Sequence, residues 1–512
     1  MPIKLIALLF ALPALAKSPT WWNHSTFYEI FTRSFQDSNG DGIGDLRGLT
    51  ARLDYLNNGE QDHTARPKSL GVKGIWLTPL FPSRSYHGYD ATDYKAIDPA
   101  YGTMDDFREL IREAHRRGIK IILDIAVNHT SHEHPWFKEA KTSKHSKYRD
   151  WYVWRDQPPS WGKWYKVGNA YYYSFFDRTM PNLNWRNPEV LAAVKDLLRF
   201  WMQQGVDGFR LDAARFYAPG PSGESDSPET HAAIASFASA IRAEYPSTYF
   251  VGEIWADAPT ILSYAASGKE IDMGFNFPLA HALVPTLNDQ NTDSFAHALN
   301  EYKNLYQDVK ASAPFLTNHD MIRAATALWN YAPKIRLAAE IYFMLPGTPF
   351  IYYGEELGAP NGKGDDDRAK RLPMQWEITE GLGFTDPGVS PWQAFLGQET
   401  IFSVAAQDEK PGTMLELYRR LVHFRNRTNV IALGNLEKIR PSPSKTLLSW
   451  NRKYDRETAM VVVNFSHKKS EPYPLESGEP KIKKVLYGNA KVASEGQVPS
   501  LAPHSLSVFL VE

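Results

Sequence analysis

The sequence predicts an α/β fold, namely a (β/α)₈ TIM barrel with an inserted subdomain after strand three and a C-terminal antiparallel β domain. Short β-like runs recur between Ser25 and Glu356, and helix-like segments or long loops separate them. One connection is far longer than an ordinary loop, and after Arg427 the pattern changes to short alternating strands. Interleaved strands and helices are typical of parallel sheets, and eight such strands are the number of a closed barrel.

Each barrel strand is predicted from a short apolar or β-branched run. Apolar residues three and four positions apart predict helices over 104–117, 188–204 and 231–245. The eight predicted strands are 27–31, 74–77, 119–123, 208–211, 249–251, 273–275, 314–316 and 350–353.

The long connection, 132–185, follows the third strand and is rich in Trp, Tyr and charged residues. It is too long for a simple loop, so we expect a small subdomain whose rings form its own core. A helix over 412–427 precedes the alternating strands 446–450 and 458–464. We therefore divide the mature chain into the barrel, 17–131 and 186–430, the insertion, 132–185, and a β domain, 431–512.

Composition excludes several classes of function. The 512 residues carry 57 Lys and Arg against 58 Asp and Glu, a net charge of −1. Such a balance provides no broad field for nucleic acid or an anionic membrane, so neither is an expected partner. The absence of cysteine excludes disulfides, thiolate nucleophiles and Cys-ligated metals, so any metal must be bound by oxygen or imidazole.

Residues 1–16 have the pattern of a signal peptide. Lys4 precedes an apolar run, and Ala14-Leu15-Ala16 is a small-x-small cleavage pattern. The alternative, a membrane anchor, needs about 20 apolar residues, and this run is shorter. We expect a secreted protein, extracellular or periplasmic, that is monomeric and has no membrane anchor after cleavage.

Acidic side chains gather where the predicted strands end, which is where barrel enzymes place their chemistry. Any one of these acids alone could be a helix cap or a turn residue with no catalytic role. Their joint occurrence at the strand ends of one barrel is not explained in that way. Cleavage of an acetal needs one carboxyl as acid and a second that meets the oxocarbenium-like transition state. The residues at the strand ends are Asp124, Asn128, His129, Arg210, Asp212, Glu253, Asn318, His319 and Asp320.

Four ordered motifs resemble the α-amylase family of glycoside hydrolases over nearly the whole mature chain. They are DIAVNHT from Asp124, GVDGFRLDA from Gly205, GEIW from Gly252 and FLTNHD from Phe315. The resemblance implies a catalytic Asp212 as nucleophile, Glu253 as general acid/base and Asp320 as the third acid, which grips sugar hydroxyls.

The same resemblance implies a set of substrate-binding residues. Arg210, His129 and His319 match substrate-site positions of the family. The segment YHGYD resembles the loop that supplies a histidine and a stacking tyrosine, here His87 and Tyr89. Asp90 stands where many α-glucosidases have Asp and many α-amylases have Trp.

Further segments resemble the branch intermediate between oligo-1,6-glucosidases and neopullulanases, which contains exported bacterial α-amylases. They are MPNLN from Met180, YYGEELG from Tyr352 and RLPMQW from Arg371. Phe216 occupies the position of a histidine that helps bind calcium in other α-amylases, so no metal is assigned beside the insertion. Met321 follows NHD where Gln is common.

A calcium site is predicted earlier in the chain. The loop from Asp37 to Asp45 has oxygen side chains at alternate positions and glycines between them, which suits a hard cation such as Ca²⁺. An EF-hand is excluded because Gly48 stands where the bidentate Glu is needed; a polar turn without metal is the other interpretation. The resemblance implies as metal ligands Asp37, Asn39, Asp41, Asp45 and the carbonyl of Ile43.

We predict a retaining hydrolase of α-1,4-glucosidic bonds in starch-like glucans and maltooligosaccharides, an endo-acting α-amylase. The enzyme alternatives are an exo-acting α-glucosidase or oligo-1,6-glucosidase, or a glucanotransferase. A non-enzymatic alternative is an inactive barrel that binds sugar or a protein partner, but such a binder has no need for all three acids.

Overall fold

A computed structural model of the protein describes residues 20–60, 64, 66–220, 223–306, 311–396, 400–470, 473–474, 481–490, 497–498 and 500–512. The predicted signal peptide, 1–16, lies outside these residues. Within them, no helix is both long and apolar enough to cross a bilayer.

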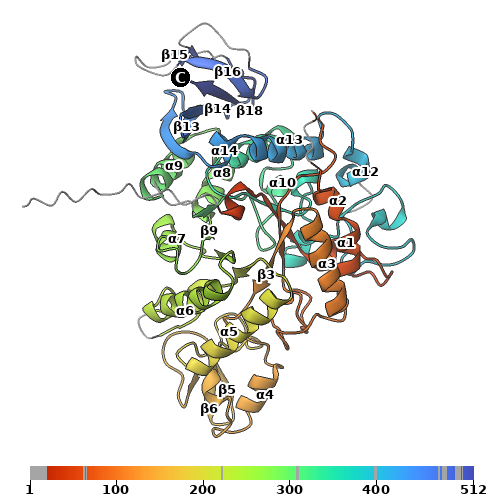
Figure 1. The fold of residues 1–512 in the computed structure, drawn as a ribbon, viewed down its shortest axis with the longest axis vertical. Coiled ribbons are helices and arrows are strands. Elements are labelled where there is room, and N and C mark those ends of the chain that lie inside the picture. Colours follow the sequence, from red (N-terminus) through yellow and green to blue (C-terminus); the bar gives the residue numbers. More distant parts are fainter. Residues whose placement is uncertain are drawn as a thin grey trace, which may run out of the picture.

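Eight parallel strands form one barrel sheet, which confirms the predicted fold (Figure 1). Their order around the sheet is β10-β9-β8-β7-β3-β2-β1-β11, and a parallel bridge between Phe315 and Phe350 joins the two edges. The strands are β1 (Phe27–Ile30), β2 (Gly74–Leu77), β3 (Lys120–Ile125), β7 (Gly208–Leu211), β8 (Tyr249–Gly252), β9 (Met273–Phe275), β10 (Ser312–Ala313) and β11 (Phe350–Tyr352).

Five strands differ by one or more residues from the predicted ranges, and two of these differences bear on the site. The seventh, β10, ends at Ala313, before the predicted 314–316, because Pro314 has no N–H to donate to the ladder. Pro314 contributes only its carbonyl, which accepts from the Phe350 amide at 2.9 Å. The third, β3, continues to Ile125, so Asp124 lies within the strand and in register with Arg210 of β7.

Several of the helices that follow barrel strands begin at side-chain caps. A capping box at Thr103 starts α3 (Met104–Arg116), and Asn187 caps α5 (Pro188–Gln203). Ser227 caps α6 (Pro228–Glu244), three residues before the predicted start, because Ser followed by Pro is itself a helix-start signal. The remaining helices are α1 (Leu46–Ala51), α2 (Leu53–Leu56), α7 (Ala258–Ala265), α8 (Phe277–Asp289), α9 (Asp293–Leu305), α10 (Ala324–Ala327), α11 (Ala332–Phe343), α12 (Val404–Gln407), α13 (Met414–Arg427) and α14 (Asn429–Ala432).

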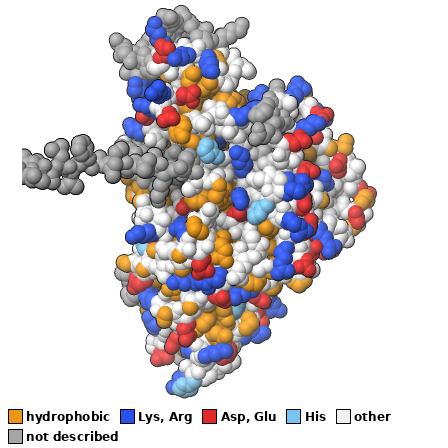
Figure 2. Space-filling model, viewed as in Figure 1, with side chains coloured by type: hydrophobic (Ala, Val, Ile, Leu, Met, Phe, Trp, Pro, Cys, Tyr) orange, Lys and Arg blue, Asp and Glu red, His pale blue; other side chains and the backbone are white. Residues whose placement is uncertain are grey.

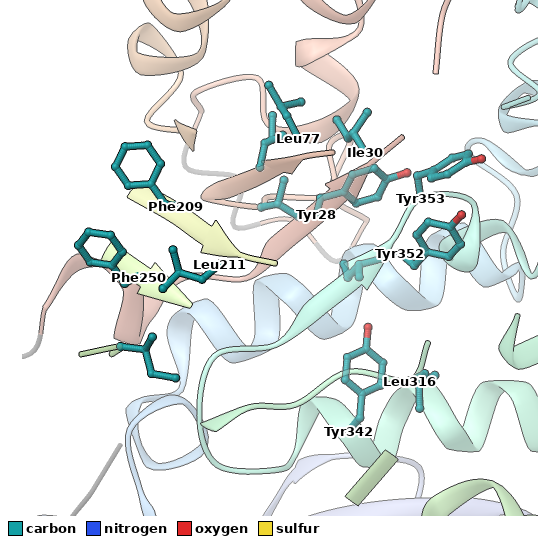
Figure 3. Packing of buried hydrophobic residues seen from close by; sticks show 14 of the residues in the cluster. Tyr28, Ile30, Leu77, Phe209, Leu211, Phe250, Leu316, Tyr342, Tyr352 and Tyr353 are labelled. Carbon is teal, nitrogen blue, oxygen red and sulfur yellow. The ribbon is translucent and has the colours of Figure 1, made fainter. Parts of the chain in front are cut away.

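Strand alternation separates two hydrophobic clusters. Tyr28, Phe209 and Phe250 belong to the large cluster shared with the helices (Figure 3). Phe27 and Tyr249, one residue away along the strands, belong to a second cluster that includes residues from seven of the barrel strands. Successive side chains of a strand point to opposite faces of the sheet. The second cluster, and residues two positions away from its members along a strand, therefore face the barrel interior.

The insertion contains α4 (Pro135–Ala140) and a three-stranded antiparallel sheet of β4 (Trp154–Arg155), β6 (Ala170–Tyr173) and β5 (Trp164–Val167). Its rings pack on one another, with Phe137 4.9 Å from Tyr152 and 5.8 Å from Trp154 between centroids. In Figure 1 this segment and the C-terminal sheet lie at opposite ends of the molecule.

The C-terminal sheet is antiparallel and runs β12-β13-β14-β18-β16. Figure 2 shows acidic and basic side chains interspersed over the face in view, as a net charge near zero predicts. The strands are β12 (Asn435–Pro441), β13 (Leu447–Tyr454), β14 (Glu457–Asn464), β16 (Ile482–Tyr487) and β18 (Ser505–Val511), with a separate pair β15 (Tyr473–Pro474) and β17 (Gln497–Val498).

Candidate active site

The predicted catalytic acids meet in one pocket at the carboxyl ends of the strands. Asp212 and Glu253 each stand one residue beyond a strand, β7 and β8, and in line with the inward-facing positions. Asp320 comes from the loop after β10. The pocket has a volume of about 210 Å³. Its lining residues are His87, Tyr89, His129, Phe176, Met180, Asp212, Glu253, Asp320, Asp367 and Arg371.

Arg210 joins three carboxyl groups from inside the barrel. Its side chain is fully buried, and Nη1 donates to Asp124 Oδ1 at 2.8 Å and to Asp212 Oδ1 at 2.5 Å. Its Nη2 lies 3.1 Å from Glu253 Oε2 but lacks the alignment of a hydrogen bond. Glu253 Oε2 instead accepts from the Ala213 amide at 2.9 Å. One guanidinium therefore contacts all three of these carboxyl groups.

A chain of hydrogen bonds connects Asp124 to the opposite side of the barrel. Asp124 Oδ2 accepts from the Tyr89 hydroxyl at 2.9 Å, and that hydroxyl is 2.7 Å from His319 Nε2. His319 Nδ1 is 2.5 Å from Glu29 Oε1 on β1. Burial opposes the charged form of His319, but the carboxylates of Asp320 and Glu29 raise its pKa above the ordinary value. Both ring nitrogens of His319 are thus engaged, and Nε2 fixes the hydroxyl of Tyr89.

Asp320 is held by two cations. Arg371 Nη2 donates to Asp320 Oδ1 at 2.8 Å, and His319 Nε2 lies 3.2 Å from Asp320 Oδ2. Burial raises the pKa of this carboxyl, but His319 and Arg371 together bring it below the ordinary value. The Asp320 side chain is 35% exposed, more than those of Asp212 and Glu253 at 11% and 13%. Asp320 is therefore an ionised acceptor that a sugar hydroxyl can reach.

The other two acids are shifted in the opposite direction. Burial raises the pKa of Asp212 to about 6, although Arg210 opposes this shift. Burial also raises the pKa of Glu253, and Arg210 again opposes it. Two carboxyls with raised pKa values beside a third with a lowered one is an arrangement that separates acid and base roles.

The predicted substrate-binding histidines lie at the pocket. His129 Nε2 donates to the Tyr89 carbonyl at 3.0 Å, and burial lowers the pKa of His129 to about 4, so the ring is neutral. His87 Nδ1 accepts from the Tyr89 amide at 3.1 Å, and burial lowers its pKa. Tyr89 is thereby held by its backbone on both sides while its hydroxyl enters the Asp124 chain.

Asp90 does not line the pocket, but it is connected to it, because the Ser85 hydroxyl that donates to Asp90 also lies 3.0 Å from Nδ1 of the pocket residue His87. The exposed fraction of Asp90 is 5%, and its Oδ1 accepts from the hydroxyls of Ser83 and Ser85. Arg210 and His319 do not line the pocket either, but they contact the groups that do.

Sequence reasoning assigned no role to four residues of the pocket wall. Phe176 and Met180 come from the insertion, and Asp367 and Arg371 follow β11. Arg371 opens the quoted motif RLPMQW and Met180 opens MPNLN, so both carried a signal. Phe176 and Asp367 carried no such signal. Phe176 stands in an aromatic-rich segment and resembles a core residue, and Asp367 is one of three consecutive acids and resembles part of a solvated loop.

The predicted calcium loop is closed by its own hydrogen bonds. Asp37 accepts from the amides of Asn39, Gly40 and Gly42 at 2.8–2.9 Å, and Asp45 accepts from Ser38 and Gly48. Asn39 and Asp41 each accept one amide two residues ahead, Asp41 that of Ile43. The side chains of the loop offer oxygen ligands of the kind that Ca²⁺ prefers. Among the described residues, however, no three acidic or histidine side chains lie close enough together to form a metal site.

Comparison with known proteins agrees with this geometry. The family described as alpha amylase, catalytic domain, matches residues 29–434. Alpha-amylase 3 of Dictyoglomus thermophilum is 36% identical over 497 residues, which cover 96% of this chain and 94% of that protein. Oligo-1,6-glucosidase of Parageobacillus thermoglucosidasius is 30% identical over 526 residues, covering 88% and 91%.

Solved structures are similar over the same length. The α-amylase from H. orenii has a TM-score of 0.85 at 36% identity, covering 96% of this chain and all of that one. An isomaltulose synthase mutant from Erwinia rhapontici, in complex with sucrose, has a TM-score of 0.84 at 27% identity, covering 96% and 99%. Matches of this extent, over the barrel that carries the three acids, place the chain in the α-amylase family of glycoside hydrolases.

Proposed function

We propose that the protein is a retaining, endo-acting α-amylase that hydrolyses internal α-1,4 bonds of starch-like glucans. The observation that carries this proposal is the contact of one buried guanidinium with both Asp212 and Glu253. Retaining enzymes hold their two carboxyls about 5–5.5 Å apart, whereas inverting enzymes leave room for a water between them. A shared guanidinium favours the closer spacing.

In this mechanism Glu253 protonates the departing oxygen and Asp212 attacks the anomeric carbon. The raised pKa of Glu253 favours its protonated form, and the 2.5 Å bond from Arg210 orients the attacking oxygen of Asp212. Water then enters, and Glu253 takes up its proton to release the sugar from Asp212. Asp320 binds hydroxyls of the distorted ring, in keeping with its lowered pKa and greater exposure.

Two features support attack within a chain. The acid that favoured attack at chain ends, Asp90, is 5% exposed and its Oδ1 is taken by two serines, so it has little capacity to bind a terminal sugar. The pocket wall is built from separate loops, with Phe176 on one side and Asp367 on another. The proposal also includes secretion through residues 1–16 and a calcium ion at the loop from Asp37 to Asp45, where Asn39 and Asp41 carry exposed oxygens.

Replacing Asp212 with Asn should lower kcat on soluble starch by about 10³-fold or more, because it removes the nucleophile. The fold should persist, which circular dichroism and the melting temperature will report. Asp367→Asn is the matched control: this carboxyl lines the same pocket but does not contact Arg210, and the loss should stay within about tenfold. Near wild-type turnover in Asp212→Asn would contradict the assignment.

The pH profile of kcat/KM should fall about tenfold per unit below about pH 6, because Asp212 must be ionised to attack and its pKa is raised to about 6. The negative charge of Asp124 contributes to that raised pKa. Asp124→Asn should therefore move the acid limb to lower pH, whatever its effect on the maximum rate. An acid limb that moves upward would contradict this electrostatic account.

Starch digestion should show early loss of viscosity and iodine colour relative to the release of reducing ends, with mixed maltooligosaccharides formed from maltoheptaose. Proton NMR in the first minutes should detect the α anomer before mutarotation. Glucose alone with unchanged viscosity would instead indicate an α-glucosidase. An initial β anomer would exclude the retaining mechanism.

Removal of calcium by a chelator should lower the melting temperature, since an ion bound only by the folded loop stabilises by mass action. Added Ca²⁺ should restore it, and Mg²⁺ should restore it less because it demands a smaller octahedral site. Asp41→Ala, which removes an exposed oxygen of the loop, should abolish the chelator effect. Metal analysis that finds no calcium, together with an unchanged melting temperature, would leave the loop as a polar turn.

A further inference from the structure

The connection between α10 and α11 holds a bulky residue in a strained backbone conformation. Trp329 has φ of +58° and Asn330 has φ of +56°, so two consecutive non-glycine residues are left-handed. Side chains with a Cβ rarely adopt this conformation, and for a large aromatic residue it is an outlier. Such strain persists where the surrounding structure imposes it, and it concentrates at functional sites.

Trp329 gains no packing in return for this strain. Its exposed fraction is 69%, the highest of any large hydrophobic residue in the described part of the chain, and that of Tyr331 is 47%. An indole left in water forgoes the free energy that burial would supply. Folding of this chain alone therefore does not account for a tryptophan here.

The indole ring is nevertheless held in place. Lys334 is 5% exposed, and its ammonium lies 4.6 Å from the centroid of the Trp329 ring. The same ammonium is 3.3 Å from Asn288 Oδ1, so it is fixed on both sides. Tyr331 is fixed separately, edge to face with the His504 ring at 5.7 Å. The chain thus presents two exposed rings whose positions are already set, which lowers the entropy cost of binding.

We propose that Trp329 and Tyr331 form a second binding surface for α-glucan chains, separate from the catalytic pocket. The inference rests on the proposed function, since it takes the same substrate class. The flat C–H faces of glucose rings stack on aromatic rings, and the exposed side-chain amide of Asn330 can hydrogen-bond a sugar hydroxyl.

A neutral, narrow ligand fits this surface better than a protein does. Stable protein interfaces bury above about 1,000 Å² around an apolar core, whereas here two rings are separated by the polar Asn330. The ammonium nearest the rings is already engaged by Asn288 and Trp329, so it does not select an anion. The connection also follows α10, which is the first helix after the loop that carries Asp320. A long chain bound here is held to the same molecule as the pocket, which raises its local concentration.

The test measures binding without hydrolysis, in the Asp212→Asn background, by retardation in gels that contain amylose. Trp329→Ala and Tyr331→Ala should each weaken retention about fivefold, and the double variant should weaken it further. With Asp212 restored, kcat/KM on maltotriose should stay within about twofold of wild type, because the substitutions lie outside the pocket.

Trp329→Gly distinguishes binding from a structural role. Glycine adopts φ of +58° without strain, so this variant should melt at a higher temperature while losing retention. Ile378→Ala, which removes an equally prominent exposed side chain elsewhere, should change neither. Unchanged retention of the Trp329→Ala variant would overturn the inference. A variant that changes its oligomeric state instead of its retention would also overturn it. A wild-type enzyme that hydrolyses no α-glucan would instead overturn the proposed function.

Discussion

The active site depends on a single buried cation, the guanidinium of Arg210. It contacts carboxyls that stand on β3, just after β7 and just after β8, so the geometry of three strands is fixed at one point. Carboxylates buried without a partner would take up protons or destabilise the fold. A lysine could not replace this arginine, because only the planar guanidinium presents several donors in fixed directions and remains charged when fully buried. Lower in the barrel, the inward-facing strand positions carry aromatic rings. The next inward-facing positions along the strands carry this polar network.

The same network distinguishes the three acids by the number and alignment of the hydrogen bonds and ion pairs that each carboxyl group makes. Asp320 has two cationic partners, Asp212 has one aligned charge-assisted hydrogen bond, and Glu253 has a guanidinium contact without alignment and one amide. Charge-assisted hydrogen bonds favour the ionised form in proportion to their geometry, whereas burial favours the neutral form of every acid. Glu253 is thus the least compensated of the three. It is the carboxyl that is best placed to retain the proton that acetal cleavage requires, and this follows from packing rather than from residue type.

The barrel and the gathering of acids at its strand ends could be predicted from the sequence because both follow from local rules. Short apolar runs that alternate with helical segments define the sheet, and strand ends define where the acids meet. Some of the parts that could not be predicted depend on contacts between distant segments, and others on local hydrogen bonds that the residue pattern does not specify. Asp367 and Phe176 reach the pocket only through the path of long loops, Asp90 is taken by two serines nearby, and Pro314 ends β10 where the apolar pattern continued. The oxygen pattern from Asp37 to Asp45 likewise predicted oxygens that can bind a metal. It did not predict that most of these oxygens accept hydrogen bonds from amides of the loop.

Substrate choice must reside in those same loops. Relatives named alpha-amylase, oligo-1,6-glucosidase and trehalose-6-phosphate hydrolase resemble this chain at 36%, 30% and 30% identity over nearly its full length. A barrel common to proteins with such different names cannot by itself discriminate among their substrates, so function has to be argued from the pocket wall. That wall combines Phe176 and Met180 of the insertion with Asp367 and Arg371 beyond β11, and Arg371 also holds Asp320. One residue therefore joins the pocket wall to the acids: a change at Arg371, in the segment after β11, alters both the shape of the wall and the contact that helps to lower the pKa of Asp320.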